Sequence, residues 1–382
     1  MNVKQALTKY AMTIATVIVI VFFAIATGGK LILPQNVNNL IAQNAYVFIL
    51  ATGMLLCILT GGNIDLSVGS ILCLVGAVGA VMMVNLKLPI ILAIIVMIII
   101  GLIIGGLQGT YIAYIGVPPF IATLAGMFAW RGLANQILQG LTISPMPDGF
   151  ANLFNSYVPD IFGGGEFNIT CFLIGIIICA VYVIYTFISR KTKQSKGYEV
   201  EALTPTLVKM IIICAVVLWF MWKLAQYKGI PVILIWVAAI VAIYTYITEK
   251  TTTGRYFYAV GGNRAATEMS GINTKKVYFI AYLNMAFLSA VAAMVTMARL
   301  NSANPTAGQN YEMDAIGSCF IGGASAYGGT GTTMGVVVGA VLMGVLNLGM
   351  SIMGVDMNWQ RVVKGTVLLV AVIFDVMSKK KS

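Results

Sequence analysis

Long apolar stretches, separated by short polar breaks, occupy most of this 382-residue chain. A helix needs about 20 mainly apolar residues to cross the hydrocarbon of a bilayer. The sequence contains about twelve stretches of this kind, several of them shorter, near residues 11–28, 45–59, 66–84, 89–110, 118–138, 169–188, 209–222, 231–247, 277–298, 315–327, 334–353 and 362–376. The pattern predicts an all-α, polytopic transmembrane bundle of about ten to twelve spans, with residues 1–382 forming a single domain.

Two of the shorter stretches, 45–59 and 315–327, are expected to be broken or re-entrant helices. Irregular backbone at membrane depth is tolerated where it lines a cavity enclosed by protein. Asp65 and Asp314 each stand beside an apolar, Gly-rich stretch, which is a weak indication of two related halves. The first stretch has the basic flank of a signal peptide but no small-residue cleavage site, so we interpret it as a span.

Basic residues gather in a few short segments, and these predict the orientation of the chain. Cytoplasmic loops of membrane proteins are enriched in Lys and Arg. The clusters are Lys4 and Lys9, then Arg190, Lys191, Lys193 and Lys196, then the loop 250–276, and finally Lys379, Lys380 and Lys381. All four are consistent with one side, so both termini are predicted to be cytoplasmic and the acidic loop 141–167 faces outward.

Composition narrows the class of protein further. Hydrophobic residues make up 59% of the chain and charged residues 9%, against about 25% charged in soluble domains. The chain has no histidine, and its six cysteines lie inside apolar runs without paired spacing, as small core residues do. We therefore predict no catalytic residue, no metal site and no cofactor in this chain. The net charge of +11 is explained by the cytoplasmic loops, and we predict no nucleic-acid partner.

The polar loop 254–276 predicts a short, capped helix. Asn263 is a suitable N-cap residue, residues 264–270 provide about two turns, and Gly271 suits the left-handed position after a helix end. A helix of two turns is marginal in water and needs something to dock against. The local pattern leaves two interpretations open: a docking helix, or an ordinary linker at the membrane interface.

Asp65, Asp314 and Arg131 are ionisable residues that lie inside or beside apolar stretches. Such a residue is costly unless it is paired, hydrogen-bonded or facing a water-filled cavity. For Asp65 the favoured interpretation is a helix cap, satisfied by Ser67 or backbone amides, and for Asp314 capping and substrate contact are equally supported. Arg131 either extends its guanidinium toward the interface or joins a polar network.

The Gly-rich run 322–344 is not a phosphate-binding loop. A nucleotide-binding loop requires a Gly, four further residues, and then Gly-Lys-Ser or Gly-Lys-Thr. This pattern occurs nowhere in the chain. Small residues also allow membrane helices to approach closely, and this explains the glycines. Any ATP hydrolysis must therefore come from a partner.

Three sequence motifs occur along the chain. Residues 259–272 fit A-x-G-G-N-x-x-A-A-x-x-S-G-I, residues 61–70 fit G-G-x-D-L-S-V-G-S with Asn63 as an additional residue, and residues 298–316 fit A-R-L-x-S-A-x-P-x-x-G-x-x-Y-E-L-D-A-I. Together they resemble the sugar permeases of the ABC importer superfamily, the ribose, galactose and xylose group. Residues 117–132 are similar to the same family.

The resemblance implies that the short helix inserts into a groove of a separate cytoplasmic ABC ATPase, which binds ATP and Mg. The implied coupling residues are Gly261, Gly262, Asn263, Ala265, Ala266, Glu268, Ser270 and Gly271. Those expected to line a translocation path are Asn63, Asp65, Ser67, Arg131, Asn304, Glu312 and Asp314. The resemblance also implies an extracytoplasmic sugar-binding protein, a permease homodimer, and a bacterial-type inner membrane.

The segment 165–250 is longer than the ribose-type pattern by two apolar segments around a Lys-rich cytoplasmic loop. Similar insertions mark xylose and multiple-monosaccharide permeases, which favours xylose or mixed sugars as cargo. The alternatives are an ABC permease for nucleosides, branched-chain amino acids or a furanone signal, and an ion-coupled secondary transporter. The latter needs ionisable residues deep in its spans, and only Asp65, Arg131, Asp314 and Lys364 qualify.

Overall fold

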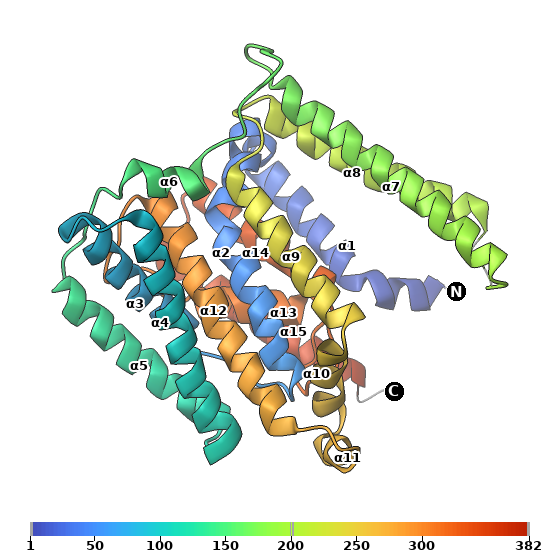
Figure 1. Ribbon diagram of the computed structural model, residues 1–382. Coiled ribbons are helices and arrows are strands. Elements are labelled where there is room, and N and C mark those ends of the chain that lie inside the picture. Colours follow the sequence, from blue (N-terminus) through green and yellow to red (C-terminus); the bar gives the residue numbers. More distant parts are fainter. Residues whose placement is uncertain (1–2, 199, 201, 380–382) are drawn as a thin grey trace.

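The computed structural model describes residues 3–198, 200 and 202–379, and in this part of the chain the regular elements are helices (Figure 1). The α-helices are α1 Val3–Ala26, α2 Pro34–Leu59, α3 Val68–Ala80, α4 Ile90–Thr110, α5 Pro119–Leu138, α6 Asp148–Asn155, α7 Ile169–Ser195, α8 Leu203–Ala225, α9 Val232–Lys250, α10 Thr252–Gly262, α11 Arg264–Met269, α12 Thr274–Leu300, α13 Tyr311–Ile321, α14 Thr333–Ile352 and α15 Met357–Lys379. The predicted all-α bundle is confirmed.

Eight helices of the described chain are long and apolar enough to cross a membrane. They are α2, α3 with its π-helical extension to Asn85, α4 with its π-helical extension to Ile115, α7, α8, α9, α12 and α14. The other predicted stretches form α1, in which Met12–Ala26 is apolar, the short α13 of 11 residues, and the more polar α5 and α15. The expectation of a broken helix at 45–59 is wrong, because α2 runs unbroken for 26 residues. The same expectation at 315–327 is confirmed, because α13 ends after 11 residues and irregular backbone follows.

The helices α2–α5 and α12–α15 form two similar halves that run in opposite directions. In each half a long helix, of 26 or 27 residues, is followed by an irregular stretch and a short helix of 13 or 11 residues. The contacts between the halves match: α2 packs on α13 and α14 as α12 packs on α3 and α4, and α3–α5 packing repeats as α13–α15. Inverted repeats of this kind are common in transporters. The weak indication of two related halves is thereby strengthened.

Helices α7 and α8 form a hairpin that stands apart from this double core (Figure 1). The two helices pack on each other, and α8 also packs on α2. Most of their apolar residues are exposed, as expected for helices surrounded by lipid. Helix α9 instead packs against α2 and α14 within the bundle. The hairpin accounts for the two extra apolar segments of the 165–250 segment, whose assignment as a subgroup insertion stays a prediction.

One end of the bundle brings together two of the predicted cytoplasmic segments, the loop 250–276 and the end of α15. There Gly329 N donates to Leu59 O at 3.0 Å, Tyr258 Oη donates to Gly331 O at 2.9 Å, and Ala326 N donates to Asp375 Oδ2 at 3.1 Å. These bonds bring together the ends of α2 and α15, α10 and the segment before α14. Helix α6 lies at the opposite end (Figure 1), in the acidic loop expected to face outward. Of the C-terminal basic cluster, Lys380 and Lys381 lie outside the described residues.

Close packing of α4 on α12 can be tested at two adjacent glycines. A Cβ on Gly105 would lie 2.8 Å from Ala286 Cβ and 2.9 Å from Leu283 Cα, whereas a Cβ on Gly106 meets nothing within 4 Å. We expect Gly105→Leu to destabilise the protein by about 1–3 kcal/mol, as overpacking does, and to lower its melting temperature in detergent. Gly106→Leu is the matched control. Equal melting temperatures for the two variants would contradict this packing.

Candidate functional site

Helix α11 is the short, capped helix predicted from the polar loop. Asn263 has extended backbone, and its Oδ1 accepts a hydrogen bond from Ala266 N at 3.0 Å, which starts the helix. Ser270 ends it, and Gly271 follows with a φ of 81°, in the left-handed region that glycine favours. Both predicted caps are confirmed.

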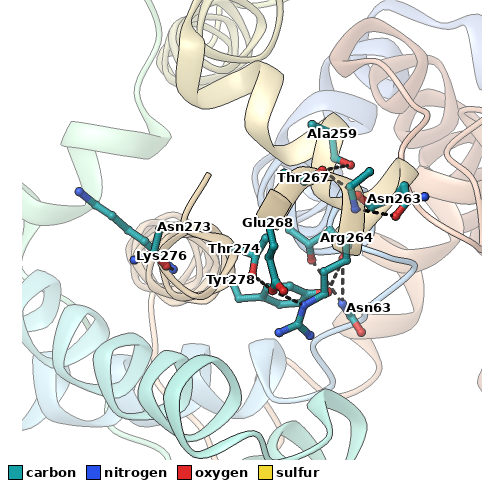
Figure 2. Close-up of polar contacts among 12 residues, drawn as sticks. Asn63, Ala259, Asn263, Arg264, Thr267, Glu268, Asn273, Thr274, Lys276 and Tyr278 are labelled. Carbon is teal, nitrogen blue, oxygen red and sulfur yellow. Dashed lines mark hydrogen bonds and ion pairs between the residues drawn. The ribbon is translucent and has the colours of Figure 1, made fainter. Parts of the chain in front are cut away.

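Two side chains of α11, Thr267 and Glu268, attach it to its neighbours (Figure 2). The buried Thr267 hydroxyl lies 2.9 Å from Ala259 O of α10 and 2.7 Å from Asn263 O. Glu268 Oε1 accepts from Thr274 Oγ1 of α12 at 2.5 Å and from Arg264 Nε at 3.1 Å. The bond from Thr274, followed by that from Arg264, holds the pKa of the Glu268 carboxyl below its usual range. The helix is thus fastened to both α10 and α12.

The rest of the α11 surface is exposed and is formed mostly by small residues. Gly262, Ala265, Ala266 and Ser270 are exposed, and the side chain of Met269 is 84% exposed. A helix lying in the membrane interface needs a broad apolar face, which α11 lacks, since Met269 is its one large apolar residue. The geometry therefore favours the docking helix over the interfacial linker.

The adjacent glycines Gly261 and Gly262 have different surroundings, which the motif does not reveal. A Cβ on Gly261 would lie 1.8 Å from Leu59 O and 2.5 Å from Gly329 N, so this glycine lets α10 rest on the end of α2. A Cβ on Gly262 meets nothing within 4 Å. Gly261 therefore serves the packing of the protein itself, while Gly262 is open to a partner.

Contacts continue from α11 to the irregular segment after α2. The Arg264 guanidinium lies 5.2 Å from the centre of the Tyr278 ring, and Tyr278 Oη donates to Thr60 O at 2.7 Å. Asn63 Nδ2 also donates to Thr60 O, at 3.4 Å. Asn63, expected to line a path, thus lies at the corner between α11, α12 and this segment (Figure 2).

Asp65 forms a compact local network. Its Oδ1 accepts from Ser67 N at 2.8 Å and from Ser67 Oγ at 2.5 Å. Ser67 Oγ in turn accepts from Gln108 Nε2 of α4 at 2.8 Å, and all three side chains are buried. Ser67 thus satisfies one carboxylate oxygen locally, as expected, but Asp65 does not cap α3, whose N-cap residue is Ser67 without a side-chain cap bond. Within the described residues Asp65 Oδ2 has no hydrogen-bond partner. The role of Gln108 was missed, because no motif links it to Asp65.

Asp314 is paired rather than left to cap a helix. Lys364 Nζ of α15 lies 2.9 Å from Asp314 Oδ1 and 3.1 Å from Oδ2, and Tyr46 Oη of α2 donates to Oδ2 at 2.6 Å. The Tyr46 ring stacks on Tyr311 with centroids 3.5 Å apart. Asp314 is buried, with 1% of its side chain exposed. Tyr46 was not anticipated, since it lies 268 residues away in sequence.

Two cavities lie in this part of the bundle, and the first of them adjoins the ion pair. One of about 490 Å³ is lined by Tyr46, Asp314 and Lys364, and one of about 330 Å³ by Arg131 and Glu312. Both are also lined by the same three residues, Gln309, Asn310 and Arg361.

Arg131 and Asn304 show how the loop before α13 is held. Arg131 Nη1 donates to Ala307 O at 2.5 Å and to Pro305 O at 3.2 Å, so it joins a polar network. Asn304 Oδ1 accepts from Thr306 N at 3.1 Å and shapes its own loop. Arg131 and Glu312 therefore line one of these cavities and Asp314 the other, whereas Asn304 lines neither.

Comparison with known proteins agrees with this architecture. Residues 36–152 and 148–372 match the family described as branched-chain amino acid transport system / permease component. The chain is 38% identical to the xylose transport system permease protein XylH of Haemophilus influenzae over 98% of both chains. It is 36% identical to XylH of Escherichia coli, over 98% of this chain and 93% of the relative. It is 36% identical to the ribose import permease protein RbsC of Haemophilus influenzae, over 89% of this chain and 85% of the relative.

No solved structure matches the chain. The family match covers most of its length, and the two XylH relatives cover 98% of it. With eight helices of spanning length and composition in its described part, the chain is a multi-pass membrane protein and belongs to the branched-chain amino acid transport system permease family.

Proposed function

We propose that this chain is the membrane-spanning subunit of an ATP-driven monosaccharide importer of a bacterial-type cell membrane, with xylose as the favoured cargo. The two XylH relatives match it over 98% of its length, while the RbsC relative matches over 89%. The chain serves transport and leaves ATP hydrolysis to a partner. Nucleosides, branched-chain amino acids and furanones are less favoured as cargo.

Helix α11 is the observation that carries this proposal. It is exposed, capped by Asn263 and fastened by Thr267, and it lies at the end of the bundle where basic residues gather. A groove on a cytoplasmic ABC ATPase, which binds ATP and Mg, would receive its small surface residues. Pre-folding of α11 lowers the entropic cost of docking.

The contacts around α11 offer a mechanical route into the bundle. When the ATPase moves α11, the Glu268–Thr274 bond carries the start of α12 with it. The Tyr278–Thr60 bond then carries the segment that leads to Asp65 and α3. Movement at the ATPase would in this way reach the irregular centre of the first half.

The opposite end offers a platform for an extracytoplasmic sugar-binding protein. Asp160 orders its loop by accepting from Thr170 Oγ1 at 2.6 Å and Gly164 N at 2.8 Å. The Thr170 bond, with these backbone bonds, holds the pKa of the Asp160 carboxyl below its usual range. The neighbouring Ile161 and Phe162 are 78% and 63% exposed. The same proposal includes a second permease copy, forming a homodimer.

Substitutions on the open face of α11 test the docking role. We expect Gly262→Trp and Ala266→Asp to reduce copurification with the ATPase, and sugar uptake, by about tenfold or more, since a bulky side chain or an unpaired charge at an interface core costs several kcal/mol. The melting temperature of the permease alone should not change, because a Cβ at Gly262 contacts nothing.

Gly106→Trp is the control for these variants. It adds the same side chain at another helical glycine with open surroundings, on α4. Normal assembly and uptake with Gly262→Trp and Ala266→Asp would rule out α11 as the docking element.

The cap of α11 gives a second, milder test. Removing an N-cap costs about 1 kcal/mol, so Asn263→Ala should raise the amide hydrogen exchange rate of Ala266 and Thr267 about fivefold and weaken ATPase binding by a similar factor. Asn263→Asp retains an acceptor at Oδ1 and should restore both properties. If Asn263→Ala speeds exchange but leaves ATPase binding unchanged, pre-folding of α11 does not contribute to docking.

A further inference from the structure

The first half of α15 carries polar side chains along one face, and the hydrocarbon of a membrane could not solvate them. Gln360, Arg361 and Lys364 line the cavity between α13 and α15, and residues four apart share a helix face. A charged side chain facing hydrocarbon is costly, and such residues face a cavity, a partner or water. The space that these side chains face is therefore enclosed by protein or filled with water, and is not occupied by lipid hydrocarbon.

The ion pair presents its ammonium group, not its carboxylate, to the cavity. Lys364 is 18% exposed and Asp314 1%. Both oxygens of Asp314 are engaged, Oδ1 by Lys364 and Oδ2 by Lys364 and Tyr46. An ammonium has three N–H donors, and the two Nζ contacts found within the described chain are both to Asp314. One donor remains for a ligand, and Asp314 acts as a positioning residue.

The other walls of the cavity fit a small polyhydroxylated molecule. The aromatic rings of Tyr46 and Tyr311 provide apolar surface beside the Gln360 amide and the Lys364 ammonium. Sugars present both C–H faces and hydroxyls, and aromatic rings with a polar neighbour suit them. A volume of about 490 Å³ lies within the range for small-molecule sites. Since Asp314 neutralises Lys364, the pair does not require a charged ligand.

We propose that this cavity is an intermediate binding site for one neutral monosaccharide within the translocation path, with Lys364 and Gln360 as its hydrogen-bonding residues. This inference rests on the proposed function and adds the residues that meet the sugar inside the membrane. The sugar hydroxyls accept from Lys364 Nζ and donate to Gln360 Oε1, since Gln360 Nε2 already donates to Val355 O at 2.9 Å.

The test uses the permease in proteoliposomes with its ATPase and binding protein, and xylose as the probe. The double variant Asp314→Asn with Lys364→Met removes both charges together, which avoids an uncompensated buried charge, and keeps an acceptor for Tyr46. We expect assembly and ATP hydrolysis to stay within about twofold of the unaltered complex. Xylose uptake should fall by about tenfold or more, as loss of a hydrogen bond to a charged group predicts.

Gln360→Leu is the second variant, because Gln360 lies outside the ion pair and its loss leaves that pair intact. It should lower uptake with normal assembly, and Thr366→Val, an exposed position on the same helix, should change neither. Uptake equal to that of the unaltered complex in either cavity variant would overturn the inference and leave the pair as a structural tether. Absence of xylose uptake by the unaltered complex would instead overturn the proposed function.

Discussion

The backbone of α3 touches the backbone of the loop before α13 at Gly69 and Gly308, and the centre of the bundle depends on this contact. A Cβ on Gly69 would lie 2.0 Å from Gly308 O, and one on Gly308 2.4 Å from Gly69 O. Broken helices expose N–H and C=O groups that lipid cannot satisfy. The close approach of the two halves encloses these irregular segments within protein.

Each irregular segment brings a carboxylate into the interior, and the two halves hold it differently. Asp65 Oδ1 accepts within two residues from Ser67, which is itself held by Gln108. Asp314 is satisfied from a distant helix by Lys364, at the wall of a cavity. The two halves thus share an arrangement of helices while differing in chemistry. Within the residues that the structure describes, it is the second half that places an ion pair beside a cavity.

The long helices α2 and α12 connect this centre to the end that carries α11. They pack against each other, and their adjoining ends are joined by the Tyr278–Thr60 bond. Gly261 seats α10 directly on the end of α2. A displacement of α10 and α11 therefore acts on both halves of the bundle at once, which suits a machine whose energy source lies outside the membrane.

The sequence by itself determined the features that depend on neighbouring residues or on solvent. Apolar length indicated the spans, clustered Lys and Arg indicated sidedness, and the spacing from Asn263 to Gly271 placed α11, because capping bonds reach only about three residues. Local sequence information was insufficient even for one of the spans. The first turns of α2, from Pro34 onward, are polar, so the predicted apolar stretch 45–59 was shorter than the continuous helix.

Tertiary structure decided everything that requires a partner from another helix. Asp314 meets Lys364 and Tyr46 across separations of 50 and 268 residues, and no local pattern specifies such a pairing. Gly261 and Gly262 are chemically identical neighbours in one motif, and only packing against Leu59 distinguishes them. Helix packing is set by the fit of whole surfaces. The sequence could therefore identify candidate residues of the site, but not which of them contact one another.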